Sequence, residues 1–198
     1  MPPKAVILVA PGFEEIELTT TFDVLVRCDV EVMLAGLKKG EIQGSRGLKI
    51  KVEKTLKDVK IEETDALILP GGSPGYLNLR KEEKVKELVK KANEFGRIVA
   101  AICGAPTVLA DAGVLAGKQC TVYPGLEGEL EKNGGKASRE AVVRDGNIIT
   151  SRGPGTAMLF AAAVAEALVG KEAAEKVLKK MVYCELPRSS VGFPARKC

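Results

Sequence analysis

The chain contains no histidine. This absence excludes Ser–His and Cys–His catalytic triads within the chain, and it excludes zinc sites with histidine ligands. Tryptophan is also absent, and aromatic residues make up only 4% of the sequence. Platforms on which bases could stack are therefore scarce, and no block of basic residues stands out. We expect no specific nucleic-acid binding.

Long hydrophobic runs and paired cysteine motifs are missing as well. No apolar segment approaches the length of a membrane span, and the apolar run in "MPPKAVILVAPG" is too short for a signal peptide. The five cysteines, an odd number without CxxC spacing, favour reduced thiols. We therefore expect a cytoplasmic protein without membrane contact; nuclear or mitochondrial placement also suits a eukaryotic source.

The remaining composition is that of an ordinary globular protein. Hydrophobic residues account for 45% and charged residues for 28% of the 198 positions. The net charge of +4 comes from interspersed residues, which indicates a solvated surface. This length predicts a single domain over residues 1–186. Residues 187–198 contain two prolines and no periodicity, so we expect an irregular tail.

Short apolar runs bounded by turn residues are typical of strands buried on both faces of a parallel sheet. Four such runs occupy residues 5–10, 30–36, 66–70 and 97–102. Helical patterns occupy 14–27, where Leu18, Phe22 and Leu25 share a face, and 81–96, which ends in Gly96. This alternation predicts an α/β fold with a parallel sheet covered on both sides.

Two segments predict antiparallel hairpins. Alternating residues surround Gly44 to Gly47, and Asp145-Gly146 is a turn sequence between two apolar runs. Beyond the second hairpin we expect helices at 157–169 and 171–183.

Cys103 stands where the apolar run 97–102 stops and a small-residue helical stretch begins. A packed thiol is one interpretation, because free cysteine is often buried. The other is a nucleophile on a sharp turn, with a helix N-terminus that lowers the pKa of the thiol. The local pattern leaves both open.

Two other segments near the strand ends also have both a structural and a functional interpretation. The "PGGSPG" loop after residue 69 is either a tight turn or a source of bare N–H groups, since Gly71 and Gly72 allow close approach. It lacks the GK[ST] ending of a phosphate-binding loop. Glu14, Glu15 and Glu17 suit the first turn of a helix, yet one of these acids can face the cleft at the strand ends.

The motifs "PGFEEIE", "LPGG", "AAICGAPTVLA", "GNIITSRGPGT" and "ALVGKEAAEKV" resemble, in order and spacing, the ThiJ/PfpI superfamily. The resemblance covers about residues 4–183 and is strongest to the branch of the parkinsonism-associated protein deglycase. It implies a flavodoxin-like three-layer sandwich with a small antiparallel excursion. It also implies a homodimer whose interface includes Glu14, Glu15, Arg27 and Arg46.

The resemblance also implies site roles. Cys103 matches the nucleophile, Glu17 its hydrogen-bonded acid, and Gly72 and Gly104 the amides of the oxyanion site, while Pro154 lines the cleft. Tyr123 stands where many relatives have histidine; it can donate a hydrogen bond but cannot act as a base at neutral pH. Gly104 replaces the histidine of peptidase-like members, so we expect no peptidase activity.

These residues imply two functions. The first is a glyoxalase and protein deglycase that needs no cofactor or metal and acts on methylglyoxal, glyoxal or early glycation adducts. The second is an oxidative-stress sensor and redox-dependent chaperone with little turnover. Both use the same cysteine and acid, so the sequence does not separate them; an inert, buried Cys103 is the third alternative.

Overall fold

The computed structural model describes residues 1–183. The expected tail at 187–198 and two cysteines, Cys184 and Cys198, lie outside the described residues. No helix among residues 1–183 has the length and apolar character needed to cross a membrane.

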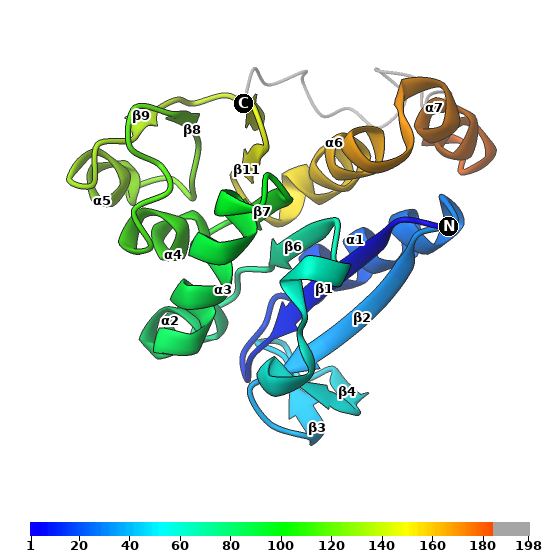
Figure 1. Cartoon of the computed structure of the whole chain (residues 1–198), viewed down its shortest axis with the longest axis horizontal. Helices are drawn as coiled ribbons and strands as arrows, with labels where there is room; N and C mark the ends of the chain where they lie inside the picture. Colours follow the sequence, from blue (N-terminus) through cyan, green and yellow to red (C-terminus); the bar gives the residue numbers. More distant parts are fainter. Residues whose placement is uncertain (184–198) are drawn as a thin grey trace.

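A seven-stranded sheet forms the centre of the molecule (Figure 1). Its order is β10-β11-β7-β6-β1-β2-β5, and all neighbours are parallel except β10 and β11. The strands are β1 (Lys4–Val9), β2 (Glu31–Gly36), β5 (Lys54–Thr55), β6 (Ala66–Leu69), β7 (Ile98–Ile102), β10 (Val142–Asp145) and β11 (Ile148–Ser151). The four runs predicted as parallel strands are all in this sheet.

Helices cover both faces of the sheet, as predicted (Figure 1). One group is α1 (Glu15–Arg27), α6 (Ala157–Val169) and α7 (Lys171–Lys180). The other is α2 (Gly75–Lys81), α3 (Glu83–Glu94), α4 (Pro106–Asp111) and α5 (Glu127–Glu131). The helix expected at 171–183 ends three residues early, at Lys180.

The buried side chains divide into two cores because neighbouring residues of a strand point to opposite faces. Along β1, Ala5, Ile7 and Val9 pack with α1 and α6, whereas Val6 and Leu8 pack with α3 and α4. The result is the flavodoxin-like three-layer sandwich that the sequence predicts.

Both predicted hairpins are present. The first consists of β3 (Gly40–Gln43) and β4 (Lys49–Val52), and the second of β10 and β11. A short parallel pair, β8 (Gln119–Cys120) with β9 (Lys136–Ala137), was not expected. Two-residue strands have too little periodicity to be recognised in a sequence.

Candidate active site

Cys103 lies on the turn between β7 and α4, with a φ of 64°. A non-glycine residue with this backbone costs about 1–3 kcal/mol and is found mainly at functional sites. Two backbone hydrogen bonds hold the turn: the Cys103 N–H donates to the Ser151 carbonyl at 3.0 Å, and the Tyr123 N–H donates to the Cys103 carbonyl at 2.9 Å. The thiol is therefore presented on a sharp turn between a strand and a helix.

Three cysteines lie in the described part of the chain, and all are free. Cys28 and Cys120 are buried in the two cores. Burial raises the pKa of Cys120 to about 11, consistent with an inert packed thiol. Cys103 is only half-buried and borders a cleft of about 550 Å³. Its surroundings favour the nucleophile over the packed thiol.

Glu17 extends from α1 toward the Cys103 thiol and is fully buried. Its Oε2 accepts the Gly71 N–H at 2.7 Å. Its Oε1 has no close hydrogen-bond partner among the described residues, and its polar neighbour is the Cys103 thiol. Burial raises the pKa of Glu17 to about 7, while the Gly71 N–H opposes this and the charge of Glu14 adds to it. Glu17 therefore holds a proton far more readily than an ordinary glutamate.

Burial and the Glu17 carboxylate raise the pKa of the Cys103 thiol to about 12. The expected lowering by a helix N-terminus is therefore wrong while Glu17 is ionised; α4 is only six residues long and begins three residues beyond the thiol. The two groups titrate as a pair that carries one negative charge above about pH 7. In one of the two arrangements of this charge, a Cys103 thiolate lies next to a protonated Glu17.

Two backbone N–H groups, those of Gly72 and Gly104, donate toward the Cys103 sulfur and lower its pKa against these effects. Gly72 has a φ of 93°, and a Cβ on it would lie 2.3 Å from the Gly12 carbonyl oxygen. The loop after β6 therefore requires glycine at this position. Gly71, the other candidate of this loop, donates to Glu17 instead. The N–H groups of Gly72 and Gly104 are thus both directed at the Cys103 sulfur.

The cleft collects most of the residues singled out in the sequence. Glu14, Arg46, Gly72, Cys103, Gly104, Tyr123 and Pro154 line it, whereas Glu17 lies behind the thiol. Glu14 also caps α1, because its carboxylate accepts the Glu17 N–H at 2.8 Å. The Tyr123 side chain is 49% exposed and its ring lies against Gly153.

Two residues of the predicted interface lie outside the cleft. Glu15 accepts hydrogen bonds from the Arg46 N–H and the Ser45 hydroxyl, which ties the β3–β4 turn to α1. Arg27 pairs with Asp23 one turn earlier in α1, at 2.7 Å.

Tyr76 is a cleft residue that the sequence reasoning missed. Its ring lies directly on Gly104, where a Cβ would come within 2.7 Å of the ring atoms. The aromatic residue in "PGGSPGYLNL" was the available clue. Its partner Gly104 is distant in sequence, so their contact depends on tertiary structure.

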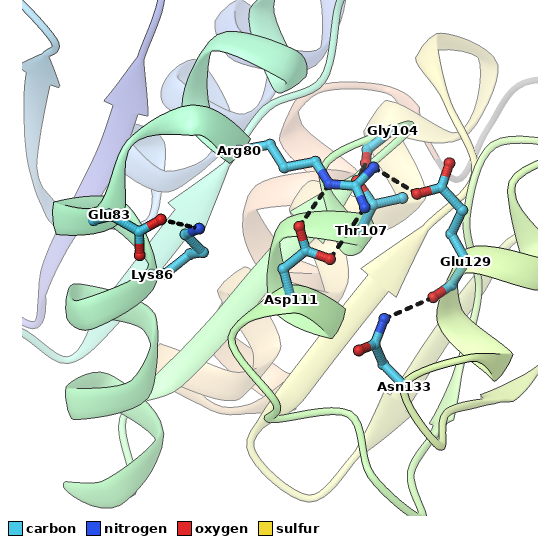
Figure 2. Close-up of polar contacts among 8 residues, drawn as sticks. All are labelled: Arg80, Glu83, Lys86, Gly104, Thr107, Asp111, Glu129 and Asn133. Atoms are coloured by element: carbon cyan, nitrogen blue, oxygen red, sulfur yellow. Dashed lines mark hydrogen bonds and ion pairs between the residues drawn. The ribbon is translucent and has the colours of Figure 1, made fainter.

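An arginine network behind the cleft was also missed, because Arg80 was interpreted as solvated surface charge. Figure 2 shows its guanidinium between two carboxylates, Asp111 and Glu129. The Arg80 Nε donates to Asp111 at 2.7 Å, and Asp111 and then Glu129 raise the pKa of Arg80. The network joins α2, α4 and α5. Each of these helices either contains a residue that lines the cleft or begins shortly after one. Nearby, the Thr107 hydroxyl donates to the Gly104 carbonyl at 2.7 Å.

A flavodoxin-like sheet that presents a thiol on a strained turn, backed by a buried carboxyl group, defines an α/β protein with a cysteine at a strand-to-helix elbow. Residues 3–167 match the model of the DJ-1/PfpI family, and the chain belongs to this family. It is 41% identical over 183 residues to Drosophila melanogaster protein dj-1beta, with 92% of this chain and 98% of the relative covered. The crystal structure of that protein superposes with a TM-score of 0.86 at 40% identity, again covering 92% and 98% of the two chains.

Two other relatives have names that describe an activity. A Caenorhabditis elegans protein named glutathione-independent glyoxalase DJR-1.2 is 37% identical, with 90% of this chain and 95% of the relative covered. A Pyrococcus abyssi protein named a deglycase is 38% identical, with 77% and 91% covered. The chain is therefore similar over most of its length to members with an enzymatic description.

Proposed function

We propose that the protein is a cysteine-dependent, cofactor-independent glyoxalase and deglycase, with methylglyoxal, glyoxal and early glycation adducts as substrates. The observation that carries the proposal is the buried Glu17 carboxyl group beside the Cys103 thiol, with the N–H groups of Gly72 and Gly104 directed at the same sulfur. A nucleophile, a proton carrier and oxyanion donors are the parts that this reaction needs.

The reaction begins with addition of the Cys103 thiolate to the aldehyde carbon of methylglyoxal. The new oxyanion accepts hydrogen bonds from the Gly72 and Gly104 N–H groups and takes the proton of Glu17, which gives a hemithioacetal. The Glu17 carboxylate then removes the C1 proton and returns it to C2, while the hydroxyl proton on the C1 oxygen passes to the C2 oxygen. The product of this step is a lactoyl thioester on Cys103, and water hydrolyses it to lactate and the free thiol.

Glu17 suits this double role because its pKa of about 7 makes both protonation states accessible near neutral pH. Tyr123, at the cleft mouth, orients the substrate carbonyl through its hydroxyl and exchanges no proton. Deglycation begins with the same thiolate addition, here to an early adduct on a protein side chain. Cys103 is only half-buried, which supports access of such an adduct to its thiol.

The test compares the wild type with Cys103→Ser and Glu17→Gln, in buffer that contains methylglyoxal but no glutathione. We expect lactate to form with the wild type and both variants to lose nearly all turnover. Cys28→Ser is the matched control, because this cysteine is buried at the C-terminal end of α1 and does not line the cleft. Equal lactate formation by Cys103→Ser and the wild type would overturn the proposal.

A second candidate is an oxidative-stress sensor and redox-dependent chaperone. The observation that favours it is the Glu17 Oε1, a buried oxygen without a close partner among residues 1–183. Two equivalents of peroxide convert a thiolate to a sulfinate and two waters. A protonated Glu17 can then donate a hydrogen bond to a sulfinate oxygen. Mass spectra after mild peroxide should show more stable sulfinate in the wild type than in Glu17→Gln; equal yields would remove this candidate.

We also propose that the protein is a homodimer with Glu14, Glu15, Arg27 and Arg46 at the interface. Arg46 is exposed beside the cleft, and its guanidinium forms no ion pair within the described part of the chain. Arginine forks bind carboxylates well across such contacts. Sedimentation at micromolar concentration should give a mass of twice 21.0 kDa. A single 21.0 kDa species would exclude the dimer.

A further inference from the structure

A second hollow adjoins the Cys103 cleft. It has a volume of about 800 Å³ and shares two wall residues, Pro124 and Gly125, with the cleft. Polar and charged side chains dominate its lining, among them Ser138, Arg139 and Arg152. The shared wall therefore places a polar hollow next to the cleft that Cys103 borders.

The backbone of Arg152, a residue of the hollow, lies next to a backbone contact of Cys103, a residue of the cleft. In the parallel register of β11 and β7, Ser151 is the partner of Ile102, and the Ser151 carbonyl accepts the Cys103 N–H. Arg152 follows Ser151 directly in the chain, so its backbone lies near the turn that carries Cys103. An anchor on Arg152 would act on a substrate whose carbonyl lies at Cys103.

The two arginines of the hollow are linked by one hydrogen bond. The Arg152 Nη1 donates to the Arg139 carbonyl at 3.3 Å. Neither guanidinium forms an ion pair within residues 1–183. Both arginines line the same hollow, and their positive charges favour an anion there. Each also presents a planar fork of N–H donors that matches a carboxylate.

Two carboxylates share the hollow, Glu127 and Glu131. The Glu127 Oε2 is engaged by the Gly125 N–H at 2.7 Å. Backbone hydrogen bonds and then the charges of Arg139 and Arg152 lower the pKa of Glu127, which stays ionised. These negative charges limit the anion that can enter. A singly charged carboxylate fits this balance better than a doubly charged phosphate.

We propose that Arg139 and Arg152 form a carboxylate-binding subsite for the substrate. The preferred substrates are then α-oxoaldehydes, or their adducts, that carry a carboxylate a few bonds from the reacting carbonyl. The inference rests on the proposed glyoxalase function and specifies its substrate class. Methylglyoxal has no group that reaches the subsite.

A suitable probe is 4,5-dioxopentanoate, an α-oxoaldehyde with a carboxylate two methylene groups beyond its ketone. Addition of one water converts it to 2-hydroxyglutarate: the aldehyde carbon is oxidised to a carboxylate and the ketone carbon is reduced to an alcohol. No external oxidant or reductant takes part. Its methyl ester is the matched neutral substrate, since the reacting carbonyls are the same.

The first measurement is the ratio of kcat/KM for the probe to kcat/KM for its methyl ester. We expect the wild type to favour the probe by about tenfold or more, the usual effect of a charge-assisted contact. In Arg139→Gln with Arg152→Gln the ratio should fall to near one. Arg144→Gln is the control, because this exposed arginine lies on β10 outside the hollow, and it should keep the wild-type ratio. A ratio near one in the wild type would overturn the subsite.

The second measurement separates the subsite from the activity. Calorimetric titration of 2-hydroxyglutarate into Cys103→Ser, which cannot turn over, should show binding that the two arginine substitutions weaken about tenfold. Such binding without turnover of any aldehyde by the wild type would support the subsite and contradict the glyoxalase function. Turnover of methylglyoxal with no binding of 2-hydroxyglutarate would do the reverse.

Discussion

Glu17→Gln should change the stability of the protein in a way that depends on pH. The Glu17 carboxyl has a pKa of about 7 in the fold, against an ordinary value of 4.5. The folded protein therefore binds a proton that the unfolded chain has released between these two values. As pH rises through this window, the wild type loses stability, and glutamine, which does not titrate, has no such loss.

The size of the effect follows from these two values. Their difference corresponds to about 3 kcal/mol, of which about 2–3 kcal/mol develops between pH 5 and pH 8. Glutamine can still accept the Gly71 N–H through its amide oxygen, so the geometry of the site persists. The free energy of unfolding of Glu17→Gln, minus that of the wild type, should thus increase by this amount over the window.

Urea unfolding of both proteins at several pH values between 5 and 8 measures this difference. Taking the difference removes the contributions of all other titrating groups, which the two proteins share. Glu94→Gln is the matched control, because Glu94 is exposed and should give a nearly constant difference. A constant difference for Glu17→Gln as well would mean that Glu17 ionises as an ordinary acid. The proton-shuttle mechanism would then lose its basis.

Three further predictions concern the surroundings of the thiol. Alkylation of wild-type Cys103 by iodoacetamide should accelerate as pH rises through about 7, where the pair with Glu17 gains its negative charge. In Glu17→Gln this rise in the alkylation rate should occur at higher pH, and an unchanged pH would contradict the coupled titration of the two groups. Tyr123→Phe should reduce turnover of methylglyoxal about two- to tenfold, the usual effect of one neutral hydrogen bond, and a loss as deep as that of Cys103→Ser would make Tyr123 chemically essential. Arg80→Met should lower the free energy of unfolding in urea by about 1 kcal/mol, since the side chains of its ion pairs are only about a quarter exposed. It should also lower kcat for methylglyoxal several-fold, because α2, α4 and α5 lose the ion pairs that join them. Arg80→Lys should restore part of kcat; full activity of Arg80→Met would show that the network does not position the cleft.

The fold was largely predictable because its local patterns agree with its tertiary structure. Strands β1, β2, β6 and β7 coincide with continuous apolar runs, and the Asp145-Gly146 sequence marks the turn between β10 and β11. The sharp turn at Cys103 was predictable for the same reason, because a strand ends and small residues follow, although this pattern left a packed and a reactive thiol equally open. Local sequence determines these features, so a single chain is enough to recognise them.

The electrostatics of the site could not be predicted in this way. The pKa of Cys103 depends on its own burial and on the charge of Glu17, which comes from α1. The local sequence shows only the helix that follows the thiol. The use of the Gly71 amide by Glu17 and the contact of Tyr76 with Gly104 likewise join distant segments. Arg80 resembles any exposed charge until α2, α4 and α5 are placed together.

The central claim is that the pair formed by Cys103 and Glu17 turns over α-oxoaldehydes repeatedly. The most direct measurement is the amount of lactate formed per mole of wild-type protein, by NMR, with excess methylglyoxal and no glutathione. We predict many equivalents of lactate per Cys103, at a rate that rises through about pH 7. One equivalent or less, with the methylglyoxal retained as protein adducts, would contradict the account.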